Sequence, residues 1–133
     1  MSKIKALLGG TRTRLAGDLT AYWEQGKVTV EFRNGRKQVV RYRSDGEFYS
    51  FRSIVIGAAV ARDFSEERLA REILTRNRSV DVVGFVRTPD GKVEGRVDQR
   101  EATLQREELL YYLATLAREA DRFEQYLTGK DRN

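Results

Sequence analysis

The sequence has no cysteine and no histidine among its 133 residues. The absence of cysteine excludes a disulfide framework, a thiolate nucleophile, a zinc ribbon and an iron–sulfur cluster. The absence of histidine excludes an imidazole base, a Ser-His-Asp triad and a histidine metal site. Catalysis would need carboxylate, lysine, tyrosine or activated hydroxyl groups, and no motif gathers them. We therefore expect a protein without catalytic residues, without metal ligands and without a cofactor.

Proline and long apolar runs are scarce as well. The chain has one proline, and its longest apolar run covers the eight residues 54–61. A helix that spans a bilayer needs about 20 apolar residues. The apolar segment after Lys3 and Lys5 is too short for a secretory signal. The sequence therefore predicts a single cytoplasmic domain over residues 1–133 that does not bind a membrane.

The positive charge is unevenly distributed along the chain. The net charge is +5, but residues 1–62 carry 12 basic and 5 acidic side chains. Residues 63–133 carry 13 basic and 15 acidic side chains. The excess of positive charge therefore lies in the first half. Such an asymmetry is typical of proteins that bind nucleic acid or an acidic protein.

The first segment with a regular apolar pattern follows a pair of glycines. We predict a helix over residues 11–24, because Leu15 and Leu19 begin an apolar series with helical spacing. The preceding residues 1–10 are expected to form a flexible N-terminus. Within it, residues 3–8 can add a helical turn.

Two further helices are predicted. One begins at Asp63 or Ser65, since both are good N-cap residues, and buries a stripe formed by Leu69, Ala70, Ile73 and Leu74. The last runs from Thr103 to about Thr128 and is the clearest element. Its apolar residues step by 4, 3, 4, 3 and 4 positions, and they are Leu109, Leu113, Leu116, Ala120, Phe123 and Leu127. This seam fits a long helix on a small sheet, or alternatively a coiled-coil dimer.

Alternating apolar and polar residues predict three consecutive antiparallel strands, over 27–33, 36–44 and 47–56. Asn-Gly and Asp-Gly pairs between them are turn signals. Two more strands, over 80–87 and 92–98, form a hairpin. The fold class is therefore α+β: a helix, three antiparallel strands, a helix, a two-strand hairpin and a long C-terminal helix. We expect the sheet to be covered mainly on one side.

This order of elements resembles the type III secretion chaperone-like fold, which also includes the YbjN-like bacterial proteins. Three local segments resemble that family too. They are Ile73-Leu74-Thr75-Arg76-Asn77, Gly84-Phe85-Val86 with Asp90-Gly91-Lys92-Val93, and Ala117-Arg118-Glu119-Ala120-Asp121-Arg122-Phe123-Glu124. The resemblance is best over residues 60–130 and rests on element order over residues 11–56. It implies a non-enzymatic, usually homodimeric protein that acts as a chaperone or regulator by binding another protein.

The most informative local feature is a basic stretch from Arg33 to Arg43. It carries five positive charges and no acid over eleven residues. Aromatic residues lie in the same three-stranded region, and cations with aromatics on a sheet can hold phosphates and stack unpaired bases. A small nucleic-acid-binding protein is therefore the alternative to a protein-binding module. The stretch also fits a solvated hairpin whose charges prevent edge pairing.

We expect a partner protein to lie on apolar and basic surface around this stretch. The candidate partner-binding residues are Trp23, Val30, Phe32, Arg36, Lys37, Arg41, Tyr42 and Arg43. The apolar members of this set fit the core equally well. A second set is expected to form the homodimer interface, because its hairpin is apolar on both faces. These residues are Val82, Phe85, Val93 and Val97.

Overall fold

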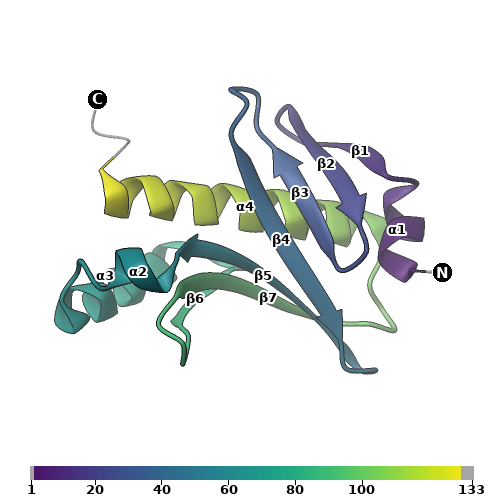
Figure 1. Ribbon diagram of the computed structural model, residues 1–133. Coiled ribbons are helices and arrows are strands. Elements are labelled where there is room, and N and C mark those ends of the chain that lie inside the picture. Colours follow the sequence, from purple (N-terminus) through teal and green to yellow (C-terminus); the bar gives the residue numbers. More distant parts are fainter. Residues whose placement is uncertain (1, 130–133) are drawn as a thin grey trace.

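A seven-stranded antiparallel sheet forms the body of the computed structural model, which describes residues 2–129 (Figure 1). The strands are β1 (Arg12–Leu15), β2 (Leu19–Glu24), β3 (Lys27–Glu31), β4 (Lys37–Ser44), β5 (Phe48–Ile56), β6 (Gly84–Arg87) and β7 (Val93–Arg100). The helices in this part of the chain are α1 (Lys3–Leu8), α2 (Ala58–Ala61), α3 (Glu66–Ser79) and α4 (Arg106–Thr128). The α+β class, the antiparallel sheet and the long C-terminal helix are confirmed.

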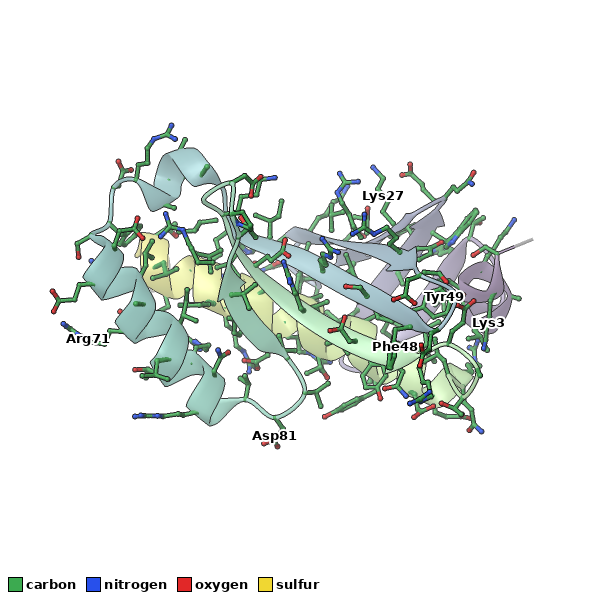
Figure 2. All side chains as sticks on the ribbon, turned by 90° about the horizontal axis from the view of Figure 1, so that it is seen from below. Lys3, Lys27, Phe48, Tyr49, Arg71 and Asp81 are labelled. Carbon is green, nitrogen blue, oxygen red and sulfur yellow. The ribbon has the colours of Figure 1, made fainter. Side chains whose placement is uncertain are left out.

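The strand order is β1-β2-β3-β4-β5-β7-β6. The first five strands form a meander in which each strand pairs with the next. The chain then passes through α2 and α3 and returns as the hairpin β6–β7, in which β7 pairs with β5. Figure 1 shows α4 crossing behind β2, β3 and β4, and Figure 2, seen from below, shows the hairpin in front of the same helix. We call the side of the sheet that packs on α4 the covered face, and the opposite side the open face.

The core lies between the covered face and α4. Strand side chains alternate between the two faces, so Val28 and Val30 of β3 and Phe51 of β5 are fully buried. All six residues of the predicted helical seam are also buried: Leu109, Leu113, Leu116, Ala120, Phe123 and Leu127. The seam is therefore buried against the sheet of the same chain.

The helix predicted over residues 11–24 is wrong, because this segment forms β1 and β2. Gly17 and Asp18 adopt φ angles of 74° and 62°, which interrupt a helix and suit a tight hairpin. β2 then pairs with β3, and Leu19 and Ala21 are buried. Apolar residues in this segment satisfy both a helical and an alternating pattern, so the turn decides between them.

The middle helix begins where the sequence predicts. Ser65 is the N-cap of α3, and its hydroxyl accepts a hydrogen bond from the backbone N–H of Arg68 at 3.1 Å. The predicted buried stripe is too wide, since Leu69 is buried but Ala70 and Leu74 are exposed. The short helix α2, which precedes α3, has no counterpart in the prediction.

The predicted strand over residues 80–87 is limited to β6. Asn77 of α3 binds the backbone of this strand twice. Its side-chain nitrogen donates to the carbonyl oxygen of Phe85 at 3.0 Å, and its side-chain oxygen accepts from the N–H of Phe85 at 2.8 Å. The side chain therefore satisfies the N–H and C=O groups of Phe85 at the edge of the sheet. Unpaired backbone groups at such an edge favour pairing with another chain.

The N-terminal segment contains the expected helical turn, α1. Ile4 and Leu8 of this turn are buried. The guanidinium of Arg106, at the start of α4, donates to the carbonyl oxygen of Leu8 at 2.9 Å. These contacts hold residues 3–8 against the beginning of the long helix.

The two ends of the predicted single domain, residue 1 and residues 130–133, lie outside the described residues. Among residues 2–129, no helix combines the length and the apolar character that crossing a bilayer requires.

The contact between β7 and α4 generates a testable prediction. A Cβ atom at Gly95 would lie 2.9 Å from Leu116, 3.0 Å from Phe85 and 3.1 Å from Val83. We expect Gly95→Ala to lower the free energy of unfolding by about 1–3 kcal/mol, because it overpacks this contact. Urea denaturation measures the change. Gly84→Ala in β6 is the matched control, since a Cβ there meets nothing within 4 Å; equal stability of the two variants would contradict the close approach.

Candidate functional site

Four cations lie side by side across the open face. Lys27 of β3 is in register with Arg41 of β4, Arg41 with Arg52 of β5, and Arg52 with Arg96 of β7. We call these four residues the cation row. Neighbouring strands are about 4.8 Å apart, so the row spans about 15 Å. Like charges opposite each other on a sheet are destabilising, so the fold tolerates this row at a cost in stability.

Carboxylates compensate the two ends of the cation row. The Nζ atom of Lys27 lies 3.8 Å from a carboxylate oxygen of Glu24. The Nε atom of Arg96 lies 2.6 Å from a carboxylate oxygen of Glu94, which is largely buried. The outer members of the row therefore have partners within the protein.

The middle of the row has no such compensation. Arg52 donates to the hydroxyl of Ser50 at 3.3 Å rather than to a carboxylate. Within residues 2–129, neither Arg41 nor Arg52 forms an ion pair, and the same holds for Arg43, two residues further along β4. The uncompensated positive charge is therefore concentrated on β4 and β5.

A groove of about 850 Å³ runs over β4 and β5, includes this charge and, where the two strands diverge, reaches Glu124 and Thr128 of α4. Its cations are Lys37, Arg41, Arg43, Arg52 and Lys92, and its apolar side chains include Val39, Ile54 and Val60. Two carboxylates in the lining, those of Glu94 and Glu124, are paired with arginines that do not line the groove. The groove thus presents positive charge beside apolar surface, including Ile54, which is 41% exposed.

The groove exists because β4 and β5 diverge. Their pairing runs from Ser44 opposite Tyr49 to Arg41 opposite Arg52 and stops there, and Figure 1 shows the two strands separating in front of α4. Side chains bridge the opening instead of backbone groups. The amide of Gln38 donates to the carbonyl oxygen of Ile54 at 2.7 Å and to the hydroxyl of Ser53 at 2.8 Å. That hydroxyl donates to the carbonyl oxygen of Val39 at 2.8 Å.

The structure divides the predicted partner-binding residues between the two faces. Lys37, Arg41 and Arg43 belong to the open groove. The ring of Tyr42 lies on the covered side, 6.3 Å from the ring of buried Phe51. Aromatic side chains and cations of β4 therefore point to opposite faces, since successive residues of a strand alternate.

The other apolar members of the predicted set also face inward. The Nε1 atom of Trp23 donates to the hydroxyl of Tyr42 at 2.8 Å, and Lys5 lies over the indole ring. Val30 is 0% exposed. Phe32 is half-buried and packs against the core. The fold uses these residues for packing.

Arg36 connects the β3–β4 hairpin to the long helix. Its Nη2 atom lies 2.7 Å from Oδ1 of Asp121 and 3.6 Å from Oε1 of Glu124. Asp121 is buried and also accepts a hydrogen bond from Gln125 at 2.6 Å. A charge-assisted hydrogen bond to a buried carboxylate makes Arg36 a structural residue.

The predicted dimer-interface residues belong to the hairpin β6–β7 and the turn before it. Phe85, Val93 and Val97 are buried within the single chain, and Val82 is half-buried. The ring of Phe85 packs edge-on against Phe123 of α4, with centroids 5.0 Å apart. Packing within one chain therefore accounts for the apolar character of this hairpin.

A shallow hollow adjoins the cationic end of the groove and is lined by Arg43, Asp45 and Phe48 among others. Asp45 accepts hydrogen bonds from the backbone N–H groups of Phe48 at 2.7 Å and Glu47 at 2.8 Å. These bonds, that of Phe48 first, hold the pKa of Asp45 below its ordinary value. The carboxylate is therefore ionised at neutral pH and stabilises the β4–β5 turn.

The charged groups of the groove define which ligands it can attract. Its exposed charges are guanidinium and ammonium groups, and its carboxylates are held in ion pairs. Within the described part of the chain, no three acidic side chains are placed to hold a metal ion. The chemistry that the groove offers is attraction of anions together with burial of apolar side chains.

No family model matches the sequence, and no curated protein is significantly similar to it.

The sequence pattern indicates the side of the groove that β4 supplies, but not the side that β5 supplies. It identified Lys37, Arg41 and Arg43 from their density along the chain. It missed Arg52 and Ile54, because their place beside β4 depends on strand register, which a single sequence does not specify. The alternation along β5 was the available signal, and it indicates a face but not a neighbour.

The cation row generates a prediction about stability. We expect the double variant Arg41→Gln with Arg52→Gln to raise the free energy of unfolding by about 0.2–1 kcal/mol at low salt, because it removes two like charges that lie opposite each other. The difference should shrink in 1 M NaCl, where screening is strong. Urea denaturation at both salt concentrations measures it.

The matched control removes two arginines from α3, Arg71→Gln with Arg78→Gln. Figure 2 shows Arg71 pointing away from the sheet, and its ion pair with Glu67 is exposed and contributes little. If Arg41→Gln with Arg52→Gln had a lower free energy of unfolding than this control at low salt, repulsion within the cation row would not be destabilising.

Proposed function

We propose that the protein is a non-enzymatic binding module that holds an acidic segment of a partner protein in the open-face groove. The observation that carries this proposal is the uncompensated charge of Arg41, Arg43 and Arg52 beside the exposed apolar side chains of Ile54 and Val60. Complementary charge accelerates association and disfavours wrong partners. Apolar contacts slow dissociation, which sets most differences in affinity.

A nucleic-acid ligand is the second candidate. The cation row supports it, because four cations within about 15 Å suit a chain of phosphates. Binding of single strands also relies on aromatic side chains that stack on bases. Tyr42 lines the groove, but its ring packs against buried Phe51. The ring of exposed Phe48, in the adjoining hollow, is covered by the guanidinium of Arg100. These rings are therefore already engaged within the protein. The protein partner is therefore favoured.

The resemblance to type III secretion chaperone-like and YbjN-like proteins belongs to the same proposal. The succession of α3, β6, β7 and α4 along the chain supports it, since these elements carry the motifs quoted for the resemblance. The homodimer that the resemblance implies is also proposed. Apolar side chains exposed outside the groove support further contacts with a second copy, among them Leu74 of α3 and Tyr111 of α4, each 54% exposed.

The homodimer predicts a particle of twice the monomer mass of 15.3 kDa. Light scattering coupled to size-exclusion chromatography, at tens of micromolar protein, measures this mass directly. A single species of 15.3 kDa under these conditions would contradict the homodimer and leave the groove proposal standing, because the groove lies within one chain.

The binding function is tested by capture from native lysate, with and without nuclease. We expect the immobilised protein to retain a protein partner after nuclease treatment. The Arg41→Gln with Arg52→Gln variant should lose most of it, whereas the Arg71→Gln with Arg78→Gln control should keep it, although both variants lose two charges. High salt should weaken capture.

Two results would contradict the proposal. Loss of every partner after nuclease treatment would favour nucleic acid, and salt-sensitive binding of labelled single-stranded DNA or RNA at micromolar protein would identify that ligand. Equal capture by the groove variant and the control would place any partner elsewhere on the molecule.

A further inference from the structure

The lining of the groove has a regular order along β4. Lys37, Val39, Arg41 and Arg43 are two residues apart, so their side chains point to the same face and are separated by about 6.8 Å at each step. All four line the groove. They form a sequence of positions that is cationic, apolar, cationic and cationic.

β5 contributes a cationic and an apolar side chain, Arg52 and Ile54, to the opposite side of the groove. Arg52 lies opposite Arg41 in the strand register. Beyond that pair the strands part, and the bridge through Gln38 keeps Ile54 alongside Val39, since its amide donates to the carbonyl oxygen of Ile54 at 2.7 Å. The apolar position is therefore flanked by both strands, and so is the neighbouring cationic position at Arg41.

The backbone at the opening is already occupied. The carbonyl oxygens of Val39 and Ile54 accept hydrogen bonds from the side chains of Ser53 and Gln38. An occupant that continued the sheet would have to share these two oxygens with the side chains that already donate to them. The geometry therefore favours an occupant that lies across the open face and is recognised through its side chains.

We infer that the groove recognises an extended acidic peptide segment in which carboxylates and one apolar side chain occupy alternate positions. This inference rests on the proposed function and specifies its ligand. An extended chain also repeats its side chains on one face every 6.8 Å or so, which matches all four positions of β4. A helix places residues on one face at steps of three and four, with about 1.5 Å of rise per residue. Its side chains therefore do not keep the 6.8 Å or so that separates the four positions of β4.

The pattern that fits is a carboxylate at Lys37, an apolar side chain between Val39 and Ile54, and carboxylates at Arg41 with Arg52 and at Arg43. One residue separates each position from the next. Charge complementarity selects the occupant, because the three arginines have no carboxylate partner within the described residues. The pattern has a single apolar position, which distinguishes it from a uniformly acidic chain.

The experiment measures binding of fluorescein-labelled synthetic peptides of about ten residues by fluorescence anisotropy. The matched peptide carries the pattern on a serine and threonine background and is made in both chain directions. A shifted peptide has the same composition, with the apolar residue moved by one position. A third peptide replaces the apolar residue by serine.

We expect the matched peptide, in one of its two directions, to bind about tenfold more tightly than the shifted and serine peptides, a difference that several surface contacts can supply. Arg41→Gln with Arg52→Gln should abolish binding of the matched peptide. Ile54→Ser should remove only the preference over the serine peptide, because Ile54 is exposed and its loss leaves the core intact. The Arg71→Gln with Arg78→Gln control should bind like the wild type.

Three outcomes would overturn the inference. Equal binding of matched and shifted peptides would show that charge alone is recognised. Groove-dependent capture of a lysate protein without binding of any of these peptides would refute the pattern and leave the proposed function intact. Displacement of the matched peptide by single-stranded DNA at equal concentration would make nucleic acid the occupant, and both proposals would fail.

Discussion

The apolar seam of α4 packs against the covered face and forms the core that holds the strands together. Leu109, Leu113 and Leu116 are each 0% exposed, and burial of such a side chain stabilises the fold by about 1.5–3 kcal/mol. The helix follows a sheet in which every strand is antiparallel to its neighbours. Because one helix supplies the apolar layer, only one face of the sheet is buried. Most of the opposite face is left to solvent, and on it Glu94 is buried in its ion pair with Arg96.

That one-sided covering is what allows the groove to exist. A buried face could not hold Arg41 and Arg52 opposite each other, since unpaired charges are very costly away from water. On the open face they cost little, and the anionic partner that we propose would relieve their repulsion. The divergence of β4 and β5 adds apolar walls at Val39 and Ile54. The bridge through Gln38 and Ser53 lets the strands part while their buried polar groups keep hydrogen bonds.

The alternation of strand side chains also separates two features that lie together in the sequence. Arg41, Tyr42 and Arg43 are consecutive, yet the aromatic ring joins the covered side and the guanidinium groups join the open one. An interpretation that relies on basic and aromatic residues being close along the chain therefore assigns to one surface what the sheet divides between two. Arg36 is separated from the groove in another way, because it is bound to buried Asp121 of α4.

Local patterns alone predict the long helix, the three strands between residues 27 and 56 and the turns between them, because apolar periodicity and turn residues act locally. The N-terminal hairpin was not predicted, since Leu19 and Ala21 fit a helix as well as a strand and the turn at Gly17 and Asp18 decides between them. The β4 side of the groove was predicted from the basic stretch, which includes Lys37, Arg41 and Arg43. The β5 side, Arg52 and Ile54, was decided only by the tertiary structure. Strand register brings Arg52 opposite Arg41, eleven positions away, and the divergence beyond that pair places Ile54 across from β4, neither of which a local pattern encodes.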